Sequence, residues 1–449
     1  MKHLFSRLSP AQKIILSFLL VIFCGSLLLS LPWVQTASSQ AGYLDHLFTA
    51  VSMVCVTGLF TRSVVDTYNV WGQLLCMLLI QIGGLGILTF IGFFTMESRK
   101  KLSLKDRRIL RDSFSYGHNR TLGQFVRSIF ITTFSIEGLG ALLLMIRFIP
   151  KFGLRKGIFN SIFLAVSAFC NAGFDNFGND SLLGLQTDVL VNITLALLII
   201  TGGLGFMVWF DLATKLGGKQ KGLHFHTKVV LLLTAGLLVF GTVTSLWTEY
   251  NNPGTIGNLS FGDKLLVSFF QTVSMRTAGF SSIDYTAARP VTLFIYLLQM
   301  FLGGAPGGTA GGLKITTFLV LLLFARKEIL GLPHTNMGRR TLSPQLVQKA
   351  FGVTVIFQLT FLLGLLALGL VTDSSHRFIY LIFETVSALA TVGVTANITT
   401  SLNTAGMVVI MLLMFIGRVG PLTLMVSLSH YQPKKATTLH YSKADIMIG

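Results

Sequence analysis

One short pattern occurs four times in this chain and constrains its fold more than any other feature. Each copy begins with Phe, has Val-Ser three residues later, and ends in a glycine. The copies are FTAVSMVCVTG, FLAVSAFCNAG, FQTVSMRTAG and FETVSALATVG, which end at Gly58, Gly173, Gly279 and Gly393. The glycines recur about every 110 residues, and such self-similarity marks repeated structural units. The third copy is one residue shorter, which predicts a local difference in its helix.

A second glycine motif follows each copy, in the stretches QIGGLGI, ITGGLGF, FLGGAPG and FIGRVGP at 81–87, 200–206, 301–307 and 415–421. Each unit then consists of an apolar span, a short helix with a loop, and a second apolar span. The short helix cannot cross a bilayer, because twelve residues from Asp45 to Val56 extend only about 18 Å. It is predicted to be re-entrant, with its loop covered by protein or water.

Composition places these units in a membrane. The chain has 449 residues, of which 52% are hydrophobic and 12% charged, whereas soluble domains carry about a quarter charged residues. Apolar runs such as DVLVNITLALLIITGGLGFMVWF are near the roughly 20 residues that span a bilayer. We predict an all-α membrane protein of eight transmembrane spans around a central pore. The units are 1–98, 99–215, 216–330 and 331–430, followed by a cytoplasmic tail, 431–449.

The net charge of +18 does not indicate nucleic acid, because its distribution follows membrane topology. Basic residues gather in alternate loops, for example RKKLSLKDRRILR and RKEILGLPHTNMGRR, whereas Asp and Glu dominate the loops between them. This asymmetry is the positive-inside rule. It predicts a multi-pass protein of the cell membrane with both termini in the cytoplasm.

The loop glycines indicate an ion filter. A filter presents backbone carbonyls to an ion in place of its hydration shell, and glycine adopts the required left-handed dihedrals without steric cost. A pore helix ending before the loop also directs its negative carboxyl-terminal partial charge at a cation. A single loop of this kind is a tight turn between helices; four copies favour a filter.

The four span–loop–span units resemble the Ktr/Trk/HKT superfamily of potassium transporters, and most closely the membrane subunit of a bacterial Ktr system. The resemblance extends from about residue 11 to about residue 428. It implies a K⁺ filter, with K⁺ bound only by main-chain carbonyls and no covalent cofactor. In plant relatives a serine replacing the first filter glycine accompanies sodium preference, so Gly58 favours potassium. The filter residues it implies are Val56, Thr57, Gly58, Asn171, Ala172, Gly173, Thr277, Ala278, Gly279, Thr391, Val392 and Gly393.

The third unit is interrupted by the stretch GGAPGGTAGG, which holds six glycines. It cannot be a stable helix, because each glycine costs about 1 kcal/mol relative to alanine and proline costs more. It lacks the Gly-Lys-Ser/Thr of a phosphate-binding loop. It is either a kink or, as the family resemblance supports, an intramembrane gate. The predicted gate residues are Gly303, Gly304, Ala305, Pro306, Gly307, Gly308, Thr309, Ala310, Gly311, Gly312 and Arg418.

Arginine and glutamate at membrane depth need partners, because a buried charge is costly. Arg418 replaces a glycine of the second motif, so we expect it to project toward the pore or to bind carbonyls of the 303–312 loop. Arg276, just before the third loop glycine, and Glu384, in the fourth short helix, are predicted to pair behind the filter. Lys314 is predicted to reach toward the cytoplasm.

The resemblance also implies partners. The family works with a cytosolic ring that binds nucleotide, which would dock on 97–113, 325–341 and the tail after Leu428. It also implies a homodimer and stimulation of potassium uptake by Na⁺. A proton- or sodium-coupled carrier of a small solute is the alternative, because such carriers also have repeats and broken helices. No nucleophile–base pair or metal cluster in the apolar spans indicates an enzyme.

Overall fold

The computed structural model describes residues 10–86, 122–178, 181–218, 220, 222–372 and 377–420. Within these ranges the chain is helical, apart from a hairpin of strands β1 (Asn336–Met337) and β2 (Arg340–Thr341), which are antiparallel. The predicted docking segments 97–113 and the tail after Leu428 lie outside the described residues.

Three helices recur in order four times: a long first helix, a short pore helix that ends three to five residues before the loop glycine, and a second helix. The units are α2 (Pro10–Leu29), α3 (Tyr43–Cys55) and α5 (Val70–Leu85); α8 (Leu122–Phe152), α9 (Leu154–Phe169) and α10 (Val189–Gly203); α12 (Phe225–Glu249), α13 (Phe261–Ser274) and α14 (Pro290–Phe301); and α16 (Pro344–Val371), α17 (Phe378–Leu389) and α18 (Thr404–Val419). The connecting helices are α4 (Val64–Thr67), α11 (Phe206–Leu216) and α15 (Ile315–Ile329), with 3-10 turns η1 (Pro32–Val34), η2 (Leu183–Leu185) and η3 (Thr399–Ser401).

Polar caps fix where the second helices begin. Asn69, Asp188 and Asn403 precede α5, α10 and α18, and each side chain accepts a hydrogen bond from a backbone N–H of the first turn. Such a cap satisfies a donor that has no partner within the helix and stabilises the helix by about 1 kcal/mol. The three units therefore start their second helices by the same device.

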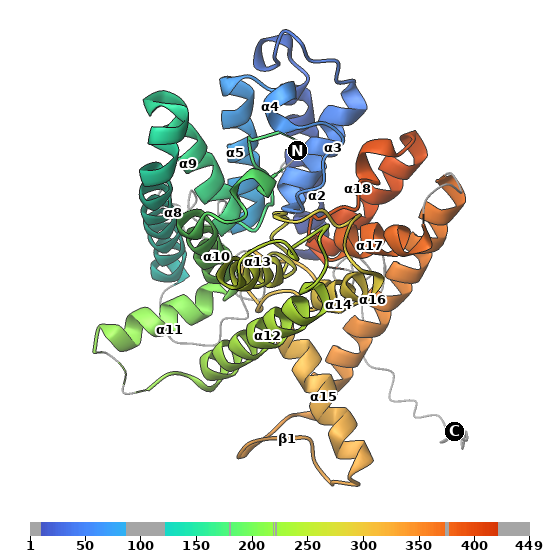
Figure 1. Ribbon diagram of the computed structural model, residues 1–449. Helices are drawn as coiled ribbons and strands as arrows, with labels where there is room; N and C mark the ends of the chain where they lie inside the picture. Colours follow the sequence, from blue (N-terminus) through green and yellow to red (C-terminus); the bar gives the residue numbers. More distant parts are fainter. Residues whose placement is uncertain are drawn as a thin grey trace, which may run out of the picture.

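The units pack in a closed cycle (Figure 1). Each first helix contacts its own pore helix, and each second helix contacts the pore helix of the following unit: α5 contacts α9, α10 contacts α13, and α14 contacts α17. The last contact, of α18 with α3, joins the fourth unit to the first. The four pore helices are thereby enclosed, and a single large core of buried apolar side chains surrounds their ends.

Within the part of the chain that the structure describes, four helices are long and apolar enough to cross a membrane, and a bent pair raises the number to five. The four are the first helices of the units. The bent pair is α10 and α11, which meet at 98°, so the run DVLVNITLALLIITGGLGFMVWF, predicted to be one span, is two helices.

Glycine dihedrals explain why the second helices stop short. Gly86, Gly205 and Gly420 follow α5, α10 and α18 and have φ of 82°, 90° and 89°, values that only glycine adopts readily. In the third unit α14 ends at Phe301 instead, before the glycine-rich stretch. All four second helices therefore end within the second glycine motif, whereas the sequence predicted an interruption only in the third unit.

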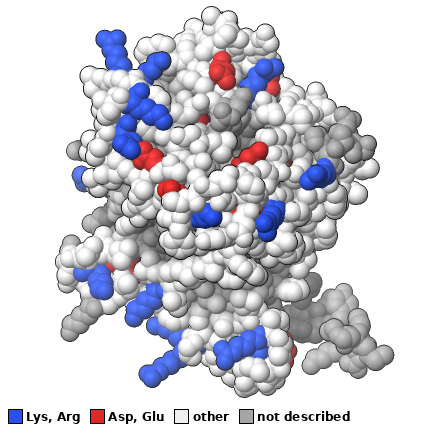
Figure 2. Space-filling view, in the orientation of Figure 1, with Lys and Arg blue, Asp and Glu red and all other residues white. Residues whose placement is uncertain are grey.

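Basic side chains occur on several parts of the visible surface (Figure 2), and two groups of them lie far apart. One group, Arg326, Arg339 and Arg340, belongs to α15 and the hairpin that follows it. The other, Lys151, Arg155 and Lys156, is exposed at the turn between α8 and α9, which lies far from the hairpin in Figure 1. Positive charge therefore lies on more than one side of the molecule, whereas the pattern of basic loops in the sequence predicted a single side.

Candidate functional site

The four loop glycines meet in a ring. A Cβ placed on Gly58 would lie 2.8 Å from the carbonyl oxygen of Ala172, the residue before Gly173. The same relation links each unit to the next: Gly173 faces the carbonyl of Ala278 at 2.8 Å, Gly279 that of Val392 at 2.8 Å, and Gly393 that of Thr57. The loops therefore surround one axis in chain order, and no side chain fits at the glycine positions.

The residue two before each glycine has an unusual backbone. Val56, Asn171, Thr277 and Thr391 have φ of 56°, 59°, 66° and 51°, a left-handed conformation that costs a β-branched residue about 1–2 kcal/mol. Strain of this kind persists only where the surrounding structure enforces it, and it is concentrated at functional sites. Its repetition at four equivalent positions makes this backbone the candidate functional element of the fold.

Capping of the pore helices produces this conformation. In the first unit the Val56 N–H donates to the Met53 carbonyl at 3.1 Å and the Thr57 N–H to the Ser52 carbonyl at 2.8 Å, the two bonds of a Schellman cap. The second and fourth units repeat both bonds, at Asn171 and Ala172 and at Thr391 and Val392. Each loop thus leaves its helix by the same tight turn.

The third loop reaches the same geometry with one residue fewer. Its Ala278 N–H donates to the Ser274 carbonyl at 2.9 Å, a span of four residues, whereas the equivalent bond from Thr57 spans five. The shorter copy in the sequence is therefore absorbed in the cap of α13, as predicted.

The serine of each motif anchors its loop. Ser52 Oγ accepts from the Gly58 N–H at 3.2 Å, Ser167 Oγ from the Phe174 N–H at 2.9 Å, and Ser387 Oγ from the Gly393 N–H at 3.0 Å. In the third unit the Ser274 hydroxyl instead donates to the Phe280 carbonyl. The sequence pattern contained these serines, but their role required the structure.

The N–H groups of the loops donate hydrogen bonds to the pore helices, whereas the carbonyls of the filter residues are left without donors. Among the residues that the structure describes, none donates a hydrogen bond to a main-chain oxygen of the twelve predicted filter residues. Buried carbonyls are rarely left without a partner. A ring of such oxygens is a ligand set for a dehydrated monovalent cation.

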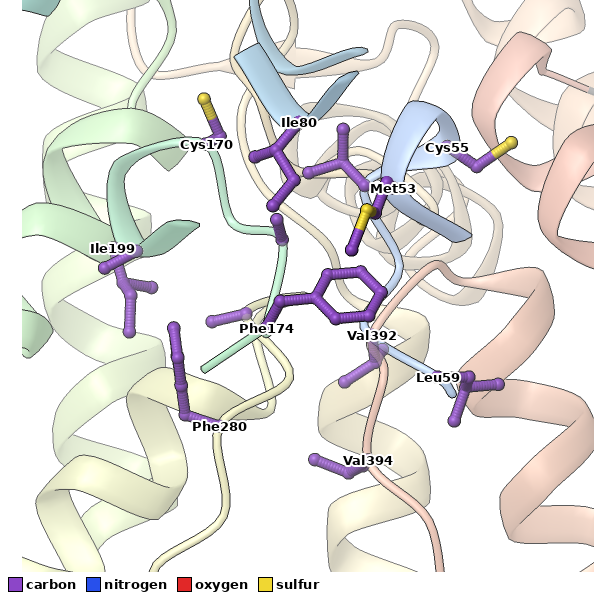
Figure 3. Close-up of a cluster of buried hydrophobic side chains, with 14 of the residues drawn as sticks. Met53, Cys55, Leu59, Ile80, Cys170, Phe174, Ile199, Phe280, Val392 and Val394 are labelled. Carbon is purple, nitrogen blue, oxygen red and sulfur yellow. The ribbon is translucent and has the colours of Figure 1, made fainter. Parts of the chain in front are cut away.

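A buried apolar side chain follows each loop glycine (Figure 3). The residues directly after the glycines are Leu59, Phe174, Phe280 and Val394, and all are at most 2% exposed. They project from four different loops into the central core. The equivalent position in each unit therefore fastens its loop by hydrophobic burial.

The 303–312 loop lies against the loops of the filter. An isolated bridge between Leu302 and Leu313 closes its base, and its Ala305 and Thr309 N–H groups donate to the carbonyls of Gly203 and Gly202 at the end of α10. Thr309 Oγ1 also contacts the Asn171 side chain at 3.0 Å. The Gly311 N–H donates to Thr277 Oγ1 at 3.2 Å, so the loop touches filter residues of the second and third units.

Arg418 fastens this loop from the other side. Its guanidinium donates to the carbonyls of Thr309, Gly83 and, at 3.2 Å, Gly84. One side chain of the fourth unit thus connects the loop with the end of α5 in the first unit. The expectation that Arg418 binds loop carbonyls agrees with this geometry. Lys314 also turns to the loop, donating to the Ala310 carbonyl at 2.6 Å, instead of extending away from it.

The glycines of the second motif allow close packing. A Cβ on Gly83, Gly202 or Gly417 would collide with the carbonyl of Val54, Phe169 or Leu389, each four residues before its loop glycine. In the third unit Gly303 faces Gly311 instead. The gate loop therefore occupies the place that the pore-helix end fills in the other units.

The predicted pair of Arg276 and Glu384 does not form. None of the ion pairs among the described residues joins them. The Glu384 carboxylate is fully buried and accepts hydrogen bonds from the hydroxyls of Thr395, at 2.7 Å, and Thr399. Arg276 donates only a long bond, of 3.5 Å, to Thr234 Oγ1. Neutral hydroxyl donors satisfy the carboxylate, so it needs no arginine.

These features are those of a membrane cation transporter in which four loops, each at the end of a short helix, meet in a ring. The chain belongs to the TrkH family of cation transport proteins, whose family model matches residues 7–438. It is a multi-pass membrane transporter and not an enzyme.

Individual relatives agree over nearly the full length. Ktr system potassium uptake protein B of Bacillus subtilis is 38% identical over 446 residues, covering 99% of this chain and 97% of that protein. The potassium/sodium uptake protein NtpJ of Enterococcus hirae is 38% identical, covering 100% of this chain and 99% of its own. The crystal structure of the potassium transporter TrkH from Vibrio parahaemolyticus has the same fold, with a TM-score of 0.74 at 17% identity, covering 93% of this chain and 84% of that one.

Proposed function

We propose that this protein conducts K⁺ across the cell membrane through the ring at Gly58, Gly173, Gly279 and Gly393, as the ion-translocating subunit of a Ktr-type uptake system. The observation that carries the proposal is the set of main-chain oxygens without hydrogen-bond donors that faces the ring from four equivalent loops. Relatives at 38% identity are named for potassium uptake and for potassium and sodium uptake. The twelve filter residues supply these oxygens.

The proposal includes the layout of the protein in the membrane. Four units of two crossings make eight spans, with second helices that break below the ring and both termini in the cytoplasm. The cyclic packing of second helices on the next pore helix supports this arrangement.

The 303–312 loop and Arg418 act together as the gate. The loop is bonded to the second, third and fourth units, which supports a place for it in the path from the ring to the interior. Undocking it requires breaking the Arg418 bonds, which gives the gate a defined closed state. A cytosolic nucleotide-binding ring, a homodimer and stimulation by Na⁺ complete the Ktr-type system. The solute-carrier alternative finds no support in a family of cation transport proteins.

Rubidium flux into liposomes that contain the purified protein tests the proposal. We expect Rb⁺ and K⁺ to compete and Na⁺ to compete weakly. Gly58→Ser places a hydroxyl beside the Ala172 carbonyl in the ring and should shift the flux toward Na⁺. Saturable uptake of an organic solute without Rb⁺ flux would contradict the proposal.

A further inference from the structure

Each filter loop is tied to its pore helix a second time, beyond the glycine, by a hydrogen bond between side chains. We call these four bonds the braces. They join Asp45 with Thr61 at 2.7 Å, Asn160 with Asn176 at 2.7 Å, Gln271 with Ser282 at 2.8 Å, and Glu384 with Thr395 at 2.7 Å.

The braces are equivalent in position. Their loop partners are the third residue after the glycine in the first three units and the second residue after it in the fourth. Gln271 and Glu384 directly follow the motif phenylalanine, at positions that Thr49 and Leu164 occupy in the other units. In these two units the pore-helix partner is instead Asp45 or Asn160. This residue lies four positions earlier, one helical turn along the same face. Four different residue types on the pore helices therefore make an equivalent hydrogen bond to the loop.

Two fixed points determine how a filter loop can move. The serine anchor holds the loop at the glycine or the residue after it, and the brace holds it two or three residues beyond. The filter residues lie between the end of the pore helix and these two points, and they include the strained left-handed residue. A backbone in such a conformation relaxes unless its surroundings enforce it, so the anchor and the brace together limit how far the carbonyl oxygens can move.

Glu384 makes the brace that is best placed for this role. Its side chain is fully buried, and its two oxygens accept from two hydroxyls, Thr395 and Thr399. Thr395 Oγ1 in turn accepts from the Ile398 N–H at 3.2 Å. A buried hydrogen-bond network of this kind rigidifies the segments that it joins.

We propose that the braces, and the Glu384 brace above all, are positioning elements that set the selectivity of the filter for K⁺ over Na⁺. This inference rests on the proposed function. Discrimination between two ions of equal charge depends on the placement and rigidity of the coordinating oxygens. A residue that fixes this placement acts on the ratio of permeabilities without contacting the ion.

The test compares Rb⁺ and Na⁺ permeability in proteoliposomes for Glu384→Ala, for Thr395→Val with Thr399→Val, and for all three changes together. Glu384→Ala should lower the Rb⁺:Na⁺ ratio about tenfold, the factor expected when a hydrogen bond to a buried group is lost. The threonine variant should lower it similarly, and the combination should add little, because all three changes remove the same brace. Glu384→Gln keeps an oxygen acceptor and should restore the ratio to within about threefold.

Ser245→Ala is the matched control. Ser245 Oγ and the Tyr296 hydroxyl form a buried hydrogen bond of 2.7 Å between α12 and α14, and Ser245 belongs to none of the braces or serine anchors. Its loss should leave the Rb⁺:Na⁺ ratio unchanged. If Glu384→Ala fails to fold, Gln271→Leu removes the third brace with the residue that the second unit carries at this position, Leu164.

The outcomes separate the inference from the function on which it rests. An unchanged ratio in brace variants that still conduct Rb⁺ would overturn the role of the braces. An equal drop in Ser245→Ala would also overturn it, because the effect would then follow from lost stability alone. Absence of Rb⁺ flux in the unmodified protein would instead refute the proposed function.

Discussion

Gly393 packs directly on the main chain of Thr57, so the last loop of the chain closes the ring against the first. A Cβ on Gly393 would overlap the Thr57 carbonyl and would lie 2.8 Å from the Gly58 Cα. Residues more than 300 positions apart therefore form one wall of the proposed pathway. Because the ring is closed by backbone contacts, changes at its glycines act on all units at once.

Replacing Gly393 with alanine should reduce Rb⁺ uptake to background. The added methyl has no space beside Thr57, and the φ of 94° is unfavourable for any other residue. Uptake in cells that lack their own potassium systems measures the effect. Gly369→Ala in α16, where a Cβ meets nothing within 4 Å, is the control and should retain normal uptake. A transporting Gly393→Ala protein would contradict the ring geometry.

Replacing Arg418 with alanine should increase basal flux. The guanidinium bonds to the Thr309, Gly83 and Gly84 carbonyls hold the gate loop, and charge-assisted bonds contribute about 1.5–3 kcal/mol each. Losing even one corresponds to roughly a tenfold shift toward the undocked loop. Liposome flux without any partner protein measures this, with the exposed Arg326→Ala as control. Lower flux from a folded Arg418→Ala protein would show that Arg418 does not act as a latch.

Replacing Gly202 with alanine should destabilise the fold. The new methyl would overlap the Phe169 carbonyl and lie 2.9 Å from Thr309 Oγ1, and overpacking of this kind costs about 1–3 kcal/mol. The thermal unfolding temperature of the purified protein should fall by several degrees. Gly138→Ala in α8 has open space around the Cβ and should raise it slightly or leave it unchanged. Equal unfolding temperatures for the two variants would exclude tight packing at Gly202.

Stability should depend on pH through Asp175, which follows the second filter loop. Burial raises the pKa of its carboxyl from 3.8 to about 6, although hydrogen bonds from the Phe177 N–H and Ser181 oppose the rise. The folded protein therefore binds this proton more tightly than the unfolded chain, and the ionised form is the destabilised one. The contribution to stability improves as pH falls from above 6 toward 4 and is constant below that.

Thermal unfolding between pH 4.5 and 8 tests this. Asp175→Asn keeps an oxygen that can accept from the Phe177 N–H, so it should be more stable than the unmodified protein near pH 8 and should lack this pH-dependent component. Asp284→Asn changes an exposed carboxylate and should leave the profile as it is. Identical profiles for Asp175→Asn and the unmodified protein would exclude the effect.

The backbone conformation of the loops could be predicted because it depends on residues that are close together in the sequence. Each repeat contains a glycine at the loop end and a Val-Ser pair before it. The structure has a positive φ at every one of these loop glycines. The non-helical stretch 303–312 was equally visible, since six glycines and a proline in ten residues exclude a helix.

Partners across the repeats could not be predicted in the same way. Arg276 and Glu384 looked complementary because both are charged and near a loop, yet the carboxylate bonds to threonines eleven and fifteen residues further along its own unit. The braces were invisible because Asp45, Asn160, Gln271 and Glu384 share neither a residue type nor one aligned position. The break in the second unit was missed because an apolar run has the same hydropathy whether it is straight or bent by 98°.

By itself, the sequence determined that the protein is a fourfold-repeated membrane protein with a glycine at each loop, because apolar length, charge distribution and backbone freedom are properties of single segments. The tertiary structure alone decided that the four loops form one closed ring, that Arg418 spans from the gate loop to the first unit, and which side chains hold each loop in place. These depend on contacts between segments far apart in the chain, where geometry and not residue type selects the partner.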